Sequence, residues 1–486
     1  MPKMTRLSGA ALSSLALALT VQPAGAETLQ QALAKAYVTN PTLNAARAGQ
    51  RATDESVAIE KAAGRPDAGV SGSYERLIHR ELSSSASTTL APRQNVSAQA
   101  SLSVPIYQGG TVRNAIRAAK MDVKAGQQDL RATESSVFAQ VVAAYLDVIA
   151  NSAVVRFNRQ NVQALEVNLQ ASSDRFQVGD LTRTDVAQSE SRLGLASANL
   201  QAAEAQLIAS KERYIQLVGD APDLLQAPPQ LPGLPASPDV AVQVALQDNP
   251  DILAAKAISQ SLHYRANAAK GQIAPRLSTF VSGSYLDYLN SETGFLNGST
   301  KSAAVGVQLT VPIYQGGRPG ALARQATARE SAALEQVIGT ERDVILQARA
   351  AYASWQASLQ AIESTRGAVS AAELSLEGVR AENSAGTRTI LDILDTQRDL
   401  LNAQVQYANA QRDAYVAGFS LLAAMGHAEA RDLNLDAGPL YDPNVNYEAV
   451  RGKFIDFDFG PKAKQVSTRT ADTRTQDATI VPSTTP

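Results

Sequence analysis

The stretch Val104-Pro105-Ile106-Tyr107-Gln108-Gly109-Gly110 occurs twice, the second time as Val311-Pro312-Ile313-Tyr314-Gln315-Gly316-Gly317. The offset is 311 − 104 = 207 residues, and other landmarks keep nearly the same register. Asn40-Pro41 recurs as Asn249-Pro250, and Gly219 recurs as Gly426. One long period of this kind indicates a tandem duplication. We therefore predict two structural repeats, at 27–218 and 239–426.

The segments outside the repeats have their own compositions. Residues 219–238 contain six prolines, which disfavour a helix and indicate an extended linker. Residues 427–486 form a C-terminal extension, and after about residue 460 it is rich in Ser, Thr, Asp and Gln with few apolar residues. Such a composition buries too little apolar surface to offset the entropy of ordering. The sequence predicts disorder there.

The N-terminus reads as a secretory signal peptide over residues 1–26. Lys3 and Arg6 precede an apolar stretch, and Ala24-Gly25-Ala26 gives a small-residue cleavage site. A membrane-anchoring helix is the alternative, but the apolar core is short and ends at that site. No later stretch offers about 20 uncharged apolar residues. An exported protein is expected, either periplasmic, secreted or held in an outer membrane by β-strands.

Composition excludes several classes of protein. The 486 residues include no cysteine, so disulfides, thiolate metal sites, thiol catalysis and thioether lipidation are ruled out. Lys and Arg number 44 against 46 Asp and Glu, for a net charge of −2. A near-neutral chain is not typical of a nucleic-acid-binding protein, and none is expected as a partner.

Each repeat carries two segments that alternate like β-strands. Apolar residues occupy every second position from Val96 to Val104, and again from Ala303 to Val311. Weaker segments precede them, so strands are predicted at about 68–78, 95–104, 277–288 and 301–311, as two hairpins. Their length suits tilted membrane-spanning strands of about 9–11 residues. A small soluble sheet packed on the helices is the alternative that alternation alone leaves open.

Most of each repeat has the pattern of long helices. The first shows no proline and a helical period from about 112 to 177, roughly 100 Å at 1.5 Å per residue. Large and small residues alternate in heptads after Gly179 and again after Gly386, which is coiled-coil packing with closely spaced helices. Gly179 and Gly386 read as C-cap glycines between a long helix and a shorter returning one.

Neither helices nor strands can complete their packing in one copy. Helices of this length must pack lengthwise against others, and four strands leave edges that a bilayer does not tolerate. The pattern therefore predicts an oligomer whose strands close one barrel and whose helices close a tube.

These motifs resemble the TolC family of outer-membrane channels over nearly the whole chain to about residue 426. The resemblance rests on the duplication, the Asn-Pro pairs, the repeated heptapeptide and the run from Gly386 to Asp395. It implies a mainly α protein with membrane β-strands: a homotrimer with a 12-stranded β-barrel in outer-membrane lipid and a periplasmic α-barrel. It also implies a periplasmic adaptor, docking at the turns around Gly179 and Gly386, and an inner-membrane ABC or proton-driven transporter.

The repeated heptapeptide is expected to be the hinge between strand and helix. Proline ends ladder pairing, and paired glycines let the backbone change direction. Tyrosine at this place anchors the elbow or lies near the lipid interface. The hinge residues are Pro105, Tyr107, Gly109, Gly110, Pro312, Tyr314, Gly316 and Gly317.

The start of the returning helices carries the candidate gate. Thr182 with Asp185, and Thr389 with Asp392, fit capping boxes, so these aspartates satisfy helix N-termini on the simpler interpretation. Asp395 does not fit a cap. The family resemblance implies an acidic ring at the periplasmic entrance formed by Asp392 and Asp395. It also implies a closed-state latch of Thr184, Asp185 and Arg388, with Asn383 where the family has a tyrosine.

No catalytic constellation is present in the sequence. The three histidines are scattered, and neither metal-ligand spacing nor a phosphate-binding loop occurs, so we expect no enzyme, no metal and no cofactor. The expected function is a passive exit duct gated at its helical tip, for type I protein secretion in preference to drug efflux. The alternatives are a surface-displayed trimeric coiled-coil adhesin and, less favoured, a secreted enzyme.

Overall fold

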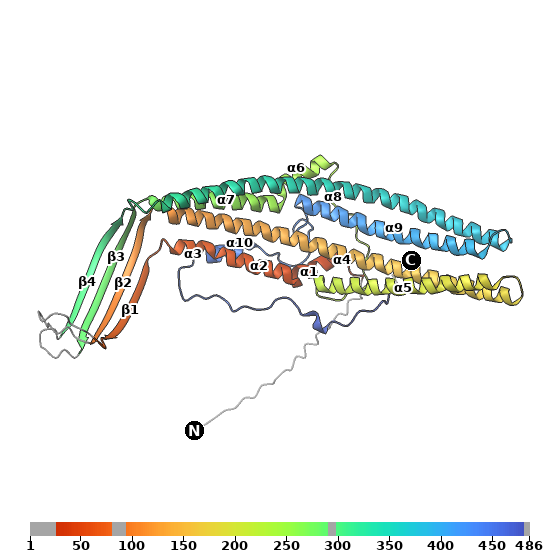
Figure 1. Ribbon diagram of the computed structural model, residues 1–486, viewed down its shortest axis with the longest axis horizontal. Coiled ribbons are helices and arrows are strands. Elements are labelled where there is room, and N and C mark those ends of the chain that lie inside the picture. Colours follow the sequence, from red (N-terminus) through yellow and green to blue (C-terminus); the bar gives the residue numbers. More distant parts are fainter. Residues whose placement is uncertain (1–25, 80–93, 290–297, 481–486) are drawn as a thin grey trace, which may run out of the picture.

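The computed structural model describes residues 26–79, 94–289 and 298–480. The proposed signal peptide, apart from Ala26, lies outside these residues, as does most of each connection between paired strands. The described chain is long and narrow, with the strands at one end and the helices extending away from them (Figure 1).

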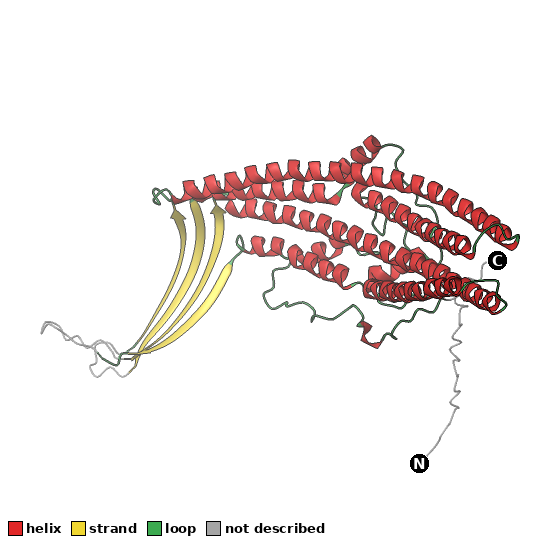
Figure 2. Cartoon of the chain, turned by 45° about the vertical axis from the view of Figure 1, so that its right-hand side comes forward, coloured by secondary structure: helices red, strands yellow, loops and turns green. Residues whose placement is uncertain are grey.

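The strands form one antiparallel sheet in the order β1-β2-β3-β4 (Figure 2). Their bounds are Asp67–Arg76 for β1, Gln94–Gln108 for β2, Arg276–Leu289 for β3 and Ser299–Thr310 for β4. The two expected hairpins are present, and β2 also pairs with β3, which joins the repeats in one sheet. Within the described residues, β1 and β4 pair on one side only, so the sheet has two open edges.

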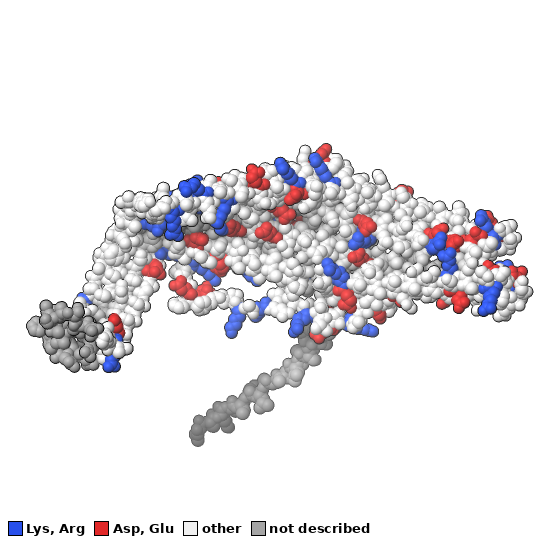
Figure 3. Space-filling model, viewed as in Figure 1, with Lys and Arg blue, Asp and Glu red and all other residues white. Residues whose placement is uncertain are grey.

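The register separates an apolar face from a polar face. Val70 pairs with Ala100, Leu102 with Val281, and Val281 with Val305, so apolar side chains share one face across all four strands. Serines share the other face, where Ser73 bonds Ser97 and Ser284 bonds Ser302. Charged residues lie only near the strand ends, and the sheet is almost uncharged in Figure 3. A lipid-facing and a water-facing surface are what a membrane β-barrel needs.

Two helical hairpins of equal size extend from the sheet. The first consists of α4 (Thr111–Gln177) and α5 (Arg183–Val218), and the second of α8 (Arg318–Ser384) and α9 (Ile390–Met425). The long helix has 67 residues and the returning helix 36 in both repeats. The heptad pattern and the C-cap glycines thus fold as the sequence predicts, and the mainly α fold with a small β part is confirmed.

Shorter helices complete each repeat. They are α1 (Leu29–Thr39), α2 (Pro41–Asp54) and α3 (Ser56–Ala62) in the first, and α6 (Pro238–Asp248) and α7 (Pro250–Lys270) in the second. The Asn-Pro motif joins the first helices of each repeat. Asn40 caps α2 and donates to Leu217 O at 2.9 Å, while Asn249 caps α7 and donates to Ala424 O at 2.9 Å. These asparagines anchor the short helices to the end of the returning helix.

The hydrophobic core belongs mostly to the first repeat. Phe138, Tyr145 and Tyr214 are completely buried where α4 and α5 meet α1. In contrast, α8 buries only four residues, and its Leu346 and Leu374 are 67% and 70% exposed. The two repeats are therefore alike in secondary structure and unlike in burial, because α8 has no cover on one side within a single copy.

One described helix, α4, contains an 18-residue window apolar enough by length and composition to cross a membrane. Half of that window is buried against neighbouring helices. Since the core above lies along this helix, internal packing accounts for the apolar run.

The C-terminal extension differs from the expected disorder. After α10 (Pro443–Val450), residues 461–480 contain one short turn, η2 (Thr470–Asp472), and otherwise run without helix or strand. They nevertheless contact the helices: Arg159 and Lys211 donate to the carbonyl groups of Ala478 and Asp477, at 3.0 and 2.8 Å. Hydrogen bonds to long basic side chains hold this polar segment, which composition alone does not reveal. Residues 481–486 lie outside the described part.

Candidate functional site

The turns of the two helical hairpins lie at the end of the molecule opposite the sheet (Figure 1). Figure 3 shows basic and acidic side chains gathered at this end. The predicted gate residues belong to these turns or to the ends of the helices on either side of them.

The first turn is built by a left-handed glycine and a capping box. Gly179 has φ 85° and follows α4, where Asp180 N donates to Arg175 O at 2.9 Å. Thr182 then caps α5: its hydroxyl accepts from Asp185 N at 3.3 Å, and Asp185 Oδ2 accepts from Thr182 N at 2.9 Å. The hydrogen bonds from the Thr182 hydroxyl and backbone lower the pKa of Asp185. This carboxylate is held within its own helix cap.

The second turn repeats the first with the same geometry. Gly386 has φ 80°, and Thr387 N donates to Glu382 O at 3.0 Å. Thr389 caps α9, and Asp392 Oδ2 accepts from Thr389 N at 2.9 Å. Hydrogen bonding from Thr389 lowers the pKa of Asp392. The capping boxes at both returning helices form as the spacing indicates.

Arg388 interacts within its own hairpin. Its Nε lies 2.8 Å from Glu382 Oε2, and its Nη1 lies 3.8 Å from Asp392 Oδ1. The hydrogen bond to Glu382 is the main cause that raises the pKa of Arg388. Asn383 donates to the carbonyl of the same arginine at 2.7 Å. Glu382, which the sequence did not single out, is therefore its nearest acidic partner.

One protomer does not bring the proposed latch together. Asp185 and Thr184 lie in the first hairpin, while Arg388 and Asn383 lie in the second. None of the hydrogen bonds or ion pairs of the described residues joins the two groups, and Thr184 is exposed. Any contact between the two groups must therefore form between copies or in another state.

Another ion pair links the two hairpins. Arg192 Nη2 on α5 lies 2.8 Å from Asp395 Oδ1 on α9. Close to it, Asn168 donates to Gln397 Oε1 at 3.0 Å, and Leu165, Ala196 and Leu394 form a buried cluster. The sequence analysis missed Arg192. The only signal was Asp395, an acid without a cap to explain it.

This pair changes the electrostatics of the proposed acidic ring. Asp395 lies between Arg192 at 2.8 Å and Arg398 at 3.5 Å, and Asp392 serves the cap of α9. Both carboxylates therefore have cationic or amide partners within the protomer, and this end of the molecule carries less unbalanced negative charge than the acids alone imply.

The strand-to-helix junctions have the expected glycine geometry. Gly109 and Gly110 have φ 64° and 78°, and their partners Gly316 and Gly317 have 61° and 78°. Only Gly109 is enclosed: a Cβ there would overlap the carbonyl oxygen of Gly271 and lie 2.8 Å from Ala274 Cβ. The same construction at Gly316 meets nothing within 4 Å.

The expectation that both prolines end strand pairing is wrong for Pro105. β2 continues to Gln108, with a shift of register between Pro105 and Tyr107, whereas Pro312 lies beyond the end of β4 at Thr310. β1 already ends opposite Ser103, so Pro105 has a neighbouring strand only on the β3 side, where it pairs with Ser278. Tyr107 is half-exposed, and Tyr314 is exposed.

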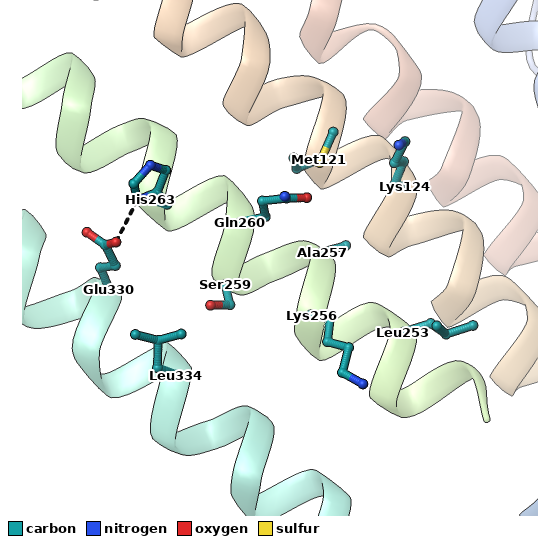
Figure 4. A pocket seen from close by; sticks show the side chains of 10 residues that line it. All are labelled: Met121, Lys124, Leu253, Lys256, Ala257, Ser259, Gln260, His263, Glu330 and Leu334. Atoms are coloured by element: carbon teal, nitrogen blue, oxygen red, sulfur yellow. Dashed lines mark hydrogen bonds and ion pairs between the residues drawn. The ribbon is translucent and has the colours of Figure 1, made fainter. Parts of the chain in front are cut away.

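A side depression along α4, α7 and α8 shows no catalytic arrangement. It is open and about 520 Å³ in volume, and its lining includes Lys124, Lys256 and His263, whose Nδ1 lies 2.7 Å from Glu330 Oε1 (Figure 4). Across the described residues, no group of three or more His, Asp or Glu is arranged to hold a metal ion.

Comparison with known proteins identifies the family. A model described as outer membrane efflux protein matches residues 29–220 and 241–427. The chain is 35% identical to the outer membrane efflux protein BepC of Brucella suis over 437 residues, 90% of this chain and 93% of BepC. It is 26% identical to the outer membrane protein TolC of Escherichia coli over 296 residues, 58% of this chain and 59% of TolC.

A solved structure has the same fold. The CmeC outer membrane channel of Campylobacter jejuni superposes with a TM-score of 0.74 at 16% identity, covering 87% of this chain and 89% of that one. The long helices, the paired repeats and the sheet of the present chain thus match the fold of an outer-membrane channel. The family match gives no support to an adhesin. The resemblance to TolC is confirmed, and the chain belongs to the outer membrane efflux protein family, with its place in the outer membrane.

Proposed function

We propose that three copies of the chain form a passive exit duct, in which twelve strands close a barrel in the outer membrane and the hairpins close a periplasmic tube. The observation that carries the proposal is the sheet of one copy, which has an apolar face, a serine-rich face and two open edges. Open edges have no place in a bilayer, so copies must pair β4 with β1.

The uneven burial of the two repeats supports the same assembly. α8 exposes Leu346, Leu374 and Leu334 along its length, while α4 is covered by α1, α2 and α5. In a closed ring, the exposed side of α8 packs against the next copy. The number three comes from the family resemblance.

In this proposal the turns of the two helical hairpins form the gate of the channel and the binding site for the adaptor. A periplasmic adaptor binds around Gly179 and Gly386, and an inner-membrane ABC or proton-driven transporter supplies the energy. Asp392 and Asp395 line the entrance, and Thr184, Asp185, Asn383 and Arg388 form latch contacts between neighbouring copies. Geometry supports this in one respect: both turns lie at the same end and carry exposed polar groups.

The proposal is tested by recording electrical currents through a planar bilayer that contains the purified protein. Discrete single-channel currents, together with a trimer mass in detergent, are the expected result. A protein that inserts and gives no unitary conductance, or that stays monomeric while conducting, would contradict the proposal.

For the cargo, we place polypeptides of a type I secretion system first, since both copies of the heptapeptide are identical. Small-molecule efflux is the second candidate because BepC is described as an efflux protein. A deletion strain separates them: loss of one extracellular protein with unchanged drug susceptibility supports secretion. Increased susceptibility with an unchanged secreted fraction supports efflux.

A further inference from the structure

The loop after α10 exposes a contiguous group of large apolar side chains. Phe454, Ile455, Phe457 and Phe459 are 76%, 62%, 85% and 87% exposed. Single exposed apolar residues are common, but four large ones within one short loop suit a surface that binds something apolar. These exposures show that none of the described residues covers the group.

The loop is a defined structure, closed by its own polar contacts. Lys453 Nζ lies 2.8 Å from Asp458 Oδ2, and Gly460 N donates to Asp458 Oδ1 at 3.2 Å. Gly460 has φ 69°, which turns the chain back towards the helices. Lys453 and Asp458 thus pair across the base of the loop, and the apolar side chains of the loop are left exposed.

Two hydrogen bonds fix the loop beside the first strand. Lys61 Nζ donates to Arg451 O at 2.6 Å, and Arg65 Nη1 donates to Lys453 O at 2.6 Å. Arg65 is two residues before β1, which begins at Asp67. The loop therefore lies where the chain passes from helices to strands, close to α3 and the end of the sheet (Figure 1).

The base of the loop is positively charged. After burial, the main causes that lower the pKa of Lys61 are three neighbouring cations, Lys120, Arg451 and Arg65, with Glu448 opposing them. Two of the acids nearby are paired, Glu448 with Arg451 and Asp458 with Lys453, and Asp456 lies exposed between Ile455 and Phe457. A basic surface next to apolar side chains matches the phosphate groups and acyl chains at a bilayer surface.

We infer that residues 453–459 form an interfacial anchor, which inserts its phenylalanines into the periplasmic leaflet of the bilayer that the strands span. The loop is bonded to Arg65, two residues before β1, and Val70 on the apolar face of β1 is 84% exposed. Aromatic side chains on a basic support are typical of segments that lie in a membrane interface. The chain has no cysteine to carry a thioether-linked lipid, so side chains must make these contacts.

The absence of cysteine also permits a clean test, because any introduced cysteine is unique. Phe457→Cys is labelled with a nitroxide in the full-length protein, reconstituted in vesicles of phosphatidylethanolamine and phosphatidylglycerol. Val70→Cys on the apolar face serves as the lipid-exposed control. Val466→Cys serves as the aqueous control, because the adjacent Ser467 contacts Asn44 at the start of α2, at the far end of that helix from the sheet.

The measurement compares collisions with oxygen and with a water-soluble nickel chelate by electron paramagnetic resonance. The expected result is that the label at 457, like that at 70, meets oxygen more often than nickel, and that the label at 466 shows the reverse. The other three apolar side chains of the loop remain to hold it in place.

Two outcomes would overturn the inference. A label at 457 that meets nickel as often as the label at 466 is in water. A label shielded from both reagents is covered by protein, for example by a second copy of this chain. In either case lipid exposure at 70 shows that the strands are inserted, so the anchor fails while the proposed channel stands.

Discussion

Arg192 on α5 places its Nη2 atom 2.8 Å from Oδ1 of Asp395 on α9, and so connects the two helical hairpins near their tips. Both side chains are partly exposed, and such a pair contributes about 0.5 kcal/mol. In a trimer, three pairs would shift the balance between closed and open tips by about 1.5 kcal/mol, about tenfold.

Arg192→Ala is therefore expected to raise the fraction of time that single channels are open, and with it their mean conductance, by up to about tenfold. Arg175→Ala is the matched control because its ion pair with Asp180 lies within one hairpin. Equal effects of the two substitutions would show that the connection between hairpins has no part in gating.

The proposed latch predicts that Asp185→Ala combined with Arg388→Ala raises single-channel conductance. Since Arg388 is bound to Glu382 in one copy, Glu382→Ala frees the arginine without removing it. That control is expected to leave conductance unchanged or to lower it. Unchanged conductance in the double variant would exclude the latch.

The capping boxes predict local stability at the tips. Thr389→Ala removes the side-chain acceptor for Asp392 N and should cost the first turn of α9 about 1 kcal/mol. Hydrogen exchange should accelerate about fivefold at residues 390–393. Thr365→Ala, within α8, is the control and should be neutral, because the Thr365 hydroxyl donates only to carbonyl groups of its own helix, those of Ala361 and Ile362. Similar protection in both variants would argue against the cap.

The two hinge glycines predict an asymmetry between the repeats. Gly316→Ala should cost about 1–2 kcal/mol, the penalty of positive φ for alanine. Gly109→Ala carries the same penalty and also an overlap with Gly271, so its thermal unfolding temperature should fall further. Equal losses in the assembled protein would mean that a neighbouring copy encloses Gly316 as Gly271 encloses Gly109.

Glu134 predicts a pH dependence of stability. Its carboxylate accepts from Ala430 N at 2.6 Å, and burial raises its pKa above the usual value. A raised pKa means that folding favours the neutral acid. Ionising Glu134 therefore lowers the free energy of unfolding. This destabilisation is absent below the pKa of the unfolded state and grows as pH rises through the pKa of the folded state.

Glu134→Gln keeps an acceptor for Ala430 N and removes the charge. The variant should be more stable than the parent by about 1 kcal/mol at pH 8 and equal to it near pH 4. Denaturant midpoints at the two pH values measure this. A gain of the same size at both would assign the effect to packing and not to ionisation.

Several features needed only the sequence because they depend on residues close together in the chain. The bounds of α4 follow from a continuous helical period, and the caps at Thr182 and Thr389 from a spacing of three. Alternation along β2 and β4 gave the lipid-facing and water-facing sides. These patterns are decided by backbone geometry within a few residues.

Tertiary structure decided what depends on distant residues. The ion pair of Arg192 with Asp395 joins positions 203 residues apart, and no local pattern predicts it. The polar tail from 461 was expected to be disordered, yet it contacts Lys211 and Arg159.

The identical heptapeptides show the division most clearly. Sequence gives Gly109 and Gly316 the same left-handed backbone, with φ 64° and 61°. Packing encloses one and leaves the other open. Local sterics fix the backbone conformation of each glycine, but its surroundings depend on which segments fold back against it. Within one copy, the junction of the first repeat packs against Gly271 and Ala274 of the second repeat, and the junction of the second repeat has no such neighbour at Gly316.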